Sequence, residues 1–159
     1  DKDGISAAVA FAALVADARA DDQTVWDRLA DLYSRHGLWV STQKSVVRPG
    51  AEGADEIAAA MELLGERTPD TLGGLSVTGV TDYRSGAEDR PRYLAATPLG
   101  ELSLGDAGRA LIRPSGTEPK LKIYVDLKGD AGANWLAAEE DLLAKANAAA
   151  EDAVNFLGL

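Results

Sequence analysis

The chain has 159 residues, of which 46% are hydrophobic, so it is long enough to bury one core and too apolar for a disordered protein. Its formal net charge of −10 argues against nucleic acid as a partner, because duplex binding needs a basic surface that neutralises phosphates. Without cysteine and with one histidine, this sequence cannot build a disulfide or a thiolate or multi-histidine metal site. No apolar run is long enough to cross a membrane.

Two helices are predicted at the start of the chain. Residues 5–18 are rich in alanine and carry apolar side chains on nearly all sides, which is typical of a helix buried in a larger α/β domain. By itself such a helix would expose apolar surface, so we expect it to have a partner. The second helix is predicted to begin after Thr24, a good N-cap residue, and to end at Gly37. Between them, apolar residues recur every three or four positions.

A domain boundary is predicted at residues 48–50, where the sequence Arg-Pro-Gly interrupts the pattern. Short extended pieces at residues 38–40 and 45–47 lead up to it. The sequence therefore divides into residues 1–48, a helical remnant of an α/β domain, and residues 49–159, a second domain.

In the second domain, helices are predicted on both sides of a group of short strands. The helices cover residues 54–64 and 134–157, and an exposed polar loop is expected at residues 85–91. The strands are expected at residues 75–83, 93–97, 100–104, 109–112 and 121–127. Because the strands do not alternate with helices in βαβ units, we expect an α+β fold, with an antiparallel sheet and helices packed on one face.

The turn at residues 113–120, Arg-Pro-Ser-Gly-Thr-Glu-Pro-Lys, carries the groups that a protein needs to hold a phosphate without a metal. Arg113 offers a planar fork of donors for two phosphate oxygens, and Ser115 and Thr117 add hydroxyl donors. Gly116 permits backbone angles in which successive N–H groups point toward an anion. The sequence therefore predicts a phosphate-binding loop, although an ordinary surface turn uses the same residue types.

The strand that follows the loop adds positive charge on one side. Its alternation places the apolar residues of 121–127 on one face, and Lys120 and Lys122 on the other, next to the loop. Repeated cations on one strand face are unexpected in an acidic chain, which favours an anionic ligand. The role of Glu118, a carboxylate inside the same loop, stays open: it could point away, pair with a lysine or contact a sugar hydroxyl.

The run RPSGTEPKLKIY at residues 113–124 resembles the phosphate-binding loop in the C-terminal domain of the α-D-phosphohexomutases. This family comprises phosphoglucomutase, phosphomannomutase and phosphoglucosamine mutase. DKDGISAA at residues 1–8 is similar to the segment that opens the last helical part of the third domain. YSRHG at residues 33–37 is similar to the phosphoglucomutase/phosphomannomutase branch. The resemblance implies a C-terminal fragment of a four-domain protein, with residues 1–48 from the third domain and residues 49–159 as the phosphate-binding domain.

The resemblance also implies a function. Such enzymes interconvert hexose 1-phosphate and hexose 6-phosphate through a bisphosphorylated intermediate in the cytoplasm. The residues expected to bind the non-reacting phosphate of the substrate are Arg113, Ser115, Gly116, Thr117, Lys120 and Lys122. No residue of this chain matches the family's phosphoserine loop, its magnesium-binding Asp-x-Asp-x-Asp run or its sugar-binding Gly-Glu-x-Ser-Gly-His loop. We therefore expect no catalytic or metal-ligating residue here and no activity from the isolated piece.

The expected partners are the hexose phosphate substrate and the upstream domains, which would hold Mg²⁺, and neither a nucleic acid nor a membrane. Two alternatives stay open at this point. The chain could be a non-catalytic phosphosugar-binding module, or it could belong to a phosphoglucosamine mutase, because the phosphate loop does not report which sugar is preferred.

Overall fold

The two N-terminal helices lie where the sequence predicts them, in a computed structural model that describes residues 2–85 and 95–159. Helix α1 spans Gly4–Ala20 and α2 spans Val25–His36. Thr24 forms a capping box at the start of α2, because its hydroxyl accepts a hydrogen bond from the amide of Asp27 while the Asp27 side chain accepts one from the Thr24 amide. Gly37 ends α2 with a φ of 84°, a conformation that favours glycine.

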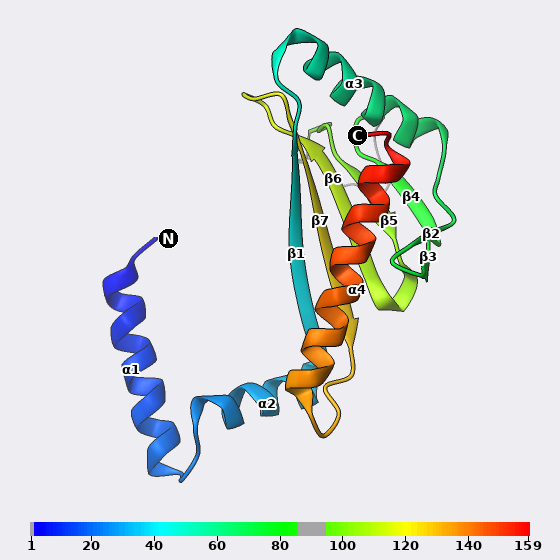
Figure 1. Ribbon diagram of the computed structural model, residues 1–159. Helices are drawn as coiled ribbons and strands as arrows, with labels where there is room; N and C mark the ends of the chain where they lie inside the picture. Colours follow the sequence, from blue (N-terminus) through cyan, green and yellow to red (C-terminus); the bar gives the residue numbers. More distant parts are fainter. Residues whose placement is uncertain (1, 86–94) are drawn as a thin grey trace.

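The rest of the chain is built around a five-stranded antiparallel sheet with the strand order β1-β7-β6-β5-β4 (Figure 1). Its strands are β1 (Leu38–Val47), β4 (Gly79–Asp82), β5 (Gly100–Ser103), β6 (Gly108–Pro114) and β7 (Lys120–Gly129). The short strands β2 (Thr71–Leu72) and β3 (Leu75–Ser76) form a separate pair, and a 3-10 turn at Gly105–Ala107 joins β5 to β6.

Two helices pack on one face of this sheet, which confirms the expected α+β architecture. Helix α4 (Trp135–Phe156) lies along the strands, and α3 (Gly50–Glu66) lies at the end where β6 turns into β7 (Figure 1). Alternate residues of β7, an interior strand, are fully buried beneath them and join one cluster with residues of both helices. The members that form the contact are Leu121, Ile123, Val125 and Leu127 from β7, Ile57, Met61 and Leu64 from α3, and Ala146, Ala149 and Ala153 from α4.

Strand β1 belongs to this sheet, and the sequence did not predict that pairing. All ten residues of β1 pair with β7, from Leu38 opposite Gly129 to Val47 opposite Lys120. On the helix side, Thr42 donates a hydrogen bond to the side chain of Asn147 in α4. The sheet thus begins before residue 48, while the assignment of residues 1–48 and 49–159 to two domains stays a prediction.

The predicted strand at residues 75–83 is divided in the structure. β3 pairs with β2, whereas β4 pairs with β5 in the main sheet, so a single continuous strand would need two partners in different sheets. Most of the predicted loop at residues 85–91 and the start of the predicted strand at residues 93–97 lie outside the described residues.

Helix α1 stands away from the sheet (Figure 1), and Ala18 is its one buried residue. Aromatic rings connect α2 to the start of α4: Trp26 stacks on Trp135 with centroids 6.0 Å apart, and Tyr33 lies 5.4 Å from the same ring. None of the described helices has the length and apolar composition that crossing a membrane requires.

Candidate functional site

The predicted phosphate loop is the hairpin connection between β6 and β7. Two short hydrogen bonds shape it: the Ser115 amide donates to the carbonyl of Lys120 at 2.7 Å, and the Lys120 amide donates to the carbonyl of Glu118 at 2.7 Å. The connection is also tied to the chain before α3, because the Arg48 amide donates to the carbonyl of Pro119 at 2.9 Å. These bonds fix the base of the hairpin and leave Gly116 and Thr117 exposed at its tip.

Gly116 does not use the left-handed backbone freedom that glycine allows, since it is absent from the described residues with positive φ. A Cβ added at this position would meet no other atom within 4 Å. What the glycine provides is open space at the tip, where a ligand can approach the backbone closely. Gly116 therefore does not adopt the left-handed angles that could turn successive N–H groups toward an anion.

Arg113 and Lys122 lie directly opposite each other at the base of the hairpin. Both point away from the face that α3 and α4 cover, because the alternate positions Ile112 and Ile123 are buried beneath the helices. Within residues 2–85 and 95–159, neither cation forms an ion pair with a carboxylate. Like charges on directly opposite residues are destabilising, so this pair is a place where an anion would relieve repulsion.

Lys120 lies on the same side of β7 as Lys122, but its charge is already paired. Its Nζ is 2.9 Å from a carboxylate oxygen of Glu118. The hydrogen bond from Lys120 is the main reason why the pKa of Glu118 lies below its ordinary value, and the charge of Lys122 lowers it slightly further. Of the three roles left open for Glu118, the structure shows the lysine pair.

On the helix side of the loop there is a pocket of about 490 Å³ between residues 114–119 and one side of α3, from Gly50 to Glu62. Ser115, Gly116 and Thr117 line it, whereas Arg113, Lys120 and Lys122 do not. The structure thus brings all six predicted residues to one hairpin and divides them between two sides. The hydroxyls and the glycine border the pocket, and the cations lie on the strands beside it.

The start of α3 is a neighbour of the loop that the sequence analysis missed. Gly50, the first residue of α3, lines the same pocket, and Pro49 at the N-cap position offers no side-chain hydrogen bond to the first amides of the helix. The sequence predicted that α3 would begin near residue 54. A proline followed by a glycine, with no Ser, Thr, Asp or Asn before the helix, was the available signal of an uncapped start.

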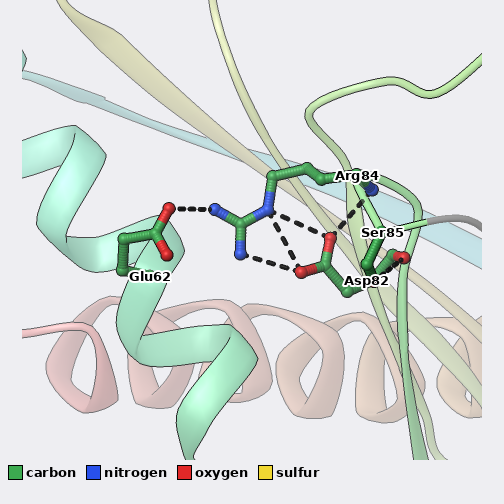
Figure 2. A network of polar contacts seen from close by, with 4 residues as sticks. All are labelled: Glu62, Asp82, Arg84 and Ser85. Carbon is green, nitrogen blue, oxygen red and sulfur yellow. Dashed lines mark hydrogen bonds and ion pairs between the residues drawn. The ribbon is translucent and has the colours of Figure 1, made fainter.

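A polar network joins α3 to the end of β4 on the far wall of the pocket (Figure 2). The Arg84 guanidinium donates to both carboxylate oxygens of Asp82, at 2.8–3.1 Å, and to Glu62 of α3 at 2.6 Å. The Arg84 hydrogen bonds lower the pKa of Asp82, and the same contacts raise the pKa of Arg84. Sequence reasoning did not identify this network, because Glu62 is 22 residues from Arg84 and the three residues belong to no motif.

Residues 77–143 match the family described as phosphoglucomutase/phosphomannomutase, C-terminal domain. The chain is 32% identical over 136 residues to a phosphoglucomutase of Staphylococcus haemolyticus, an alignment that covers 82% of the chain and 25% of that protein. The chain belongs to the phosphoglucomutase/phosphomannomutase family. It is also 33% identical over 129 residues to a probable phosphomannomutase of Haemophilus influenzae, covering 81% of the chain and 24% of that relative. The chain spans about a quarter of the length of these curated relatives.

The fold agrees with that family. The open form of the exocytosis-sensitive phosphoprotein pp63/parafusin from Paramecium, described as a phosphoglucomutase, superposes with a TM-score of 0.57 at 16% identity. The match covers all of this chain and 28% of the solved one. Residues 2–85 and 95–159 contain no group of three acidic or histidine side chains placed to hold a metal ion.

Proposed function

We propose that this chain is the part of a phosphohexomutase that binds the non-reacting phosphate of a hexose monophosphate. In the intact enzyme, a phosphoserine outside this chain would transfer its phosphoryl group to the free hydroxyl of the sugar. The other phosphate of the resulting bisphosphate would then return to that serine. The names of the relatives, phosphoglucomutase and phosphomannomutase, support this assignment. Because the residues that transfer the phosphoryl group would lie elsewhere, we expect the chain alone to have no mutase activity.

The observation that carries the proposal is the opposed pair Arg113 and Lys122 at the base of a hydroxyl-bearing hairpin, two cations that form no ion pair with a carboxylate of the described residues. A unit charge pair about 4 Å apart gains about 4 kcal/mol at an effective dielectric near 20, before desolvation and ordering costs. Two such contacts hold a dianion firmly enough to orient it and weakly enough to let it go. That balance suits a bisphosphate that must turn over between two transfers.

Each loop residue has a distinct part in this proposal. Arg113 would bind two phosphate oxygens at once, and Ser115 and Thr117 would donate hydroxyl hydrogen bonds. Gly116 would let the phosphate approach the backbone, since nothing fills the space where its Cβ would be. Lys122, and Lys120 once it is released from Glu118, would add positive charge.

The remaining parts of the proposal concern groups outside the chain. Magnesium, when bound by upstream domains, would offset the charge of the phosphoryl group in transfer. The exposed apolar side chains of α1 would pack against those domains, which would also supply the sugar-binding residues. A cytoplasmic location, as the resemblance implies, belongs to the same proposal.

Titration of the isotope-labelled chain with glucose 1-phosphate, followed by amide NMR, tests the site directly. We expect the largest shifts at residues 113–122 and at least about a tenfold loss of affinity in Arg113→Ala, because a hydrogen bond to a charged group contributes 1.5–3 kcal/mol. The matched control is Arg35→Ala, which removes the same charge in the last turn of α2 and should bind like the parent chain. Shifts confined to another part of the chain, or unchanged binding by Arg113→Ala, would contradict the assignment.

A further inference from the structure

We infer that Glu118 is a positioning residue that acts as an exchangeable counter-ion: it holds Lys120 while the loop is empty and releases this lysine to an incoming phosphate. The inference rests on the proposed function, because it concerns the same loop. In this inference, the carboxylate of Glu118 competes with the substrate phosphate for Lys120.

The geometry of the pair supports exchange. The carboxylate of Glu118 is 2.9 Å from the Nζ of Lys120, and the two residues are also linked by the hydrogen bond between their backbones. The Glu118 side chain is 61% exposed, whereas that of Lys120 is 27% exposed. Glu118 can therefore rotate into solvent at little cost, while the more enclosed lysine keeps its place beside Lys122.

The charges of the loop fit a phosphate monoester. Arg113, Lys120 and Lys122 carry three positive charges on one side of the hairpin, and Glu118 carries the negative charge that is paired with Lys120. The sum is +2, which equals the charge that a phosphate dianion would neutralise. While the loop is empty, Glu118 leaves two unpaired cations instead of three. When phosphate leaves, the carboxylate returns to Lys120, so release is easier than it would be without Glu118.

Glu118→Gln tests this exchange, because it removes the competing charge and keeps the size of the side chain. We expect Glu118→Gln to bind glucose 1-phosphate about two- to fivefold more tightly than the parent chain, the range that an exposed ion pair contributes. The matched control is Glu52→Gln, which removes one exposed negative charge from the first turn of α3, the helix whose first residue lines the pocket. Glu52 forms no ion pair with any described residue. The control should change the affinity less than the test variant does.

A double-mutant cycle with Lys120→Met separates competition for this lysine from a general effect of charge. In the Lys120→Met background, Glu118→Gln should change the affinity by less than about 1.5-fold, because the contested cation is gone. A spectroscopic readout adds to this: the side-chain carboxylate ¹³C resonance of Glu118 should move on saturation with glucose 1-phosphate, and this movement should disappear in Lys120→Met.

The outcomes are distinct. Affinity that is unchanged or weaker in Glu118→Gln, an equal gain in Glu52→Gln, or a gain that persists without Lys120 would overturn the exchange and leave phosphate binding at Arg113 intact. A carboxylate resonance that stays fixed on saturation would do the same. If the parent chain shows no loop shifts with glucose 1-phosphate, the proposed function fails, and the role of Glu118 fails with it.

Discussion

The two regions of this molecule are held together by different forces. In the sheet region, residues 38–159, apolar side chains meet across strands and helices, and Ile123 is completely buried. In the helical arm, residues 4–36, Ile5 is 82% exposed and Phe11 is 55% exposed. Among the described residues the buried cluster runs from Val40 to Leu157, so the arm contributes nothing to it. Local hydrogen bonds thus support the arm, while tertiary packing supports the sheet region.

The same substitution in both regions should give the largest contrast. Ile123→Ala removes a fully buried side chain opposite Ile112 in the centre of the sheet, and we expect it to lower the free energy of unfolding by about 2–5 kcal/mol. Ile5→Ala, the matched control in α1, should change it by less than about 0.5 kcal/mol. Urea unfolding followed by tryptophan fluorescence measures both. A comparable loss in the two variants would mean that α1 is packed in solution.

Depressed carboxyl pKa values should have different consequences in the two regions. Asp82 has its pKa lowered by the Arg84 hydrogen bonds, so the folded state gains stability at pH values above the unfolded pKa and loses it as the pH falls through the folded value. We expect Asp82→Asn to cost about 1–3 kcal/mol at pH 7. The difference from the parent chain should shrink below a pH of about 4, where the carboxylate of the unfolded chain becomes protonated.

The control for this experiment lies in the arm. The pKa of Asp27 is also lowered, by hydrogen bonds from Thr24, yet its contacts stay within the start of α2. Asp27→Asn should therefore leave the unfolding of the sheet region unchanged between pH 2 and pH 7. If Asp82→Asn showed a constant offset at all pH values, the Arg84 network would not contribute through the charge of Asp82.

Where the sequence carried a local signal, the prediction of the fold was accurate. Thr24 and Gly37 set the ends of α2, and the alternation at residues 121–127 marked the buried face of β7. The pairing of β1 with β7 could not be predicted in the same way, because the partners are more than 70 residues apart along the chain. Thr42 and Lys44, which face α4, also break the apolar alternation of β1, since edge-strand positions tolerate polar residues.

In the candidate site, too, local features could be predicted from the sequence, and contacts between distant segments could not. The residues from Arg113 to Lys122 could be assigned to one site because they follow one another in the sequence and form a single hairpin. The uncapped start of α3 and the Arg84 network reach the same pocket from distant parts of the chain, so only the packing of α3 reveals them. The pair between Glu118 and Lys120 was one of several geometries that the sequence allowed, and side-chain placement decides among them.

The smallest expected effect comes from a change at the N-cap of α2, and it tests whether the helical arm and the sheet region open independently. Thr24→Ala removes the hydroxyl that accepts the amide hydrogen bond of Asp27, and with it half of the capping box of α2. Hydrogen exchange should become several-fold faster at the first turn of α2 and stay unchanged at Ile123, because a frayed arm leaves the sheet packing intact. Ser34→Ala, in the same helix but without a capping role, should change neither. Faster exchange at Ile123 in Thr24→Ala would show instead that the rings of Trp26 and Tyr33 on Trp135 couple the arm to the sheet, so that both open as one cooperative unit.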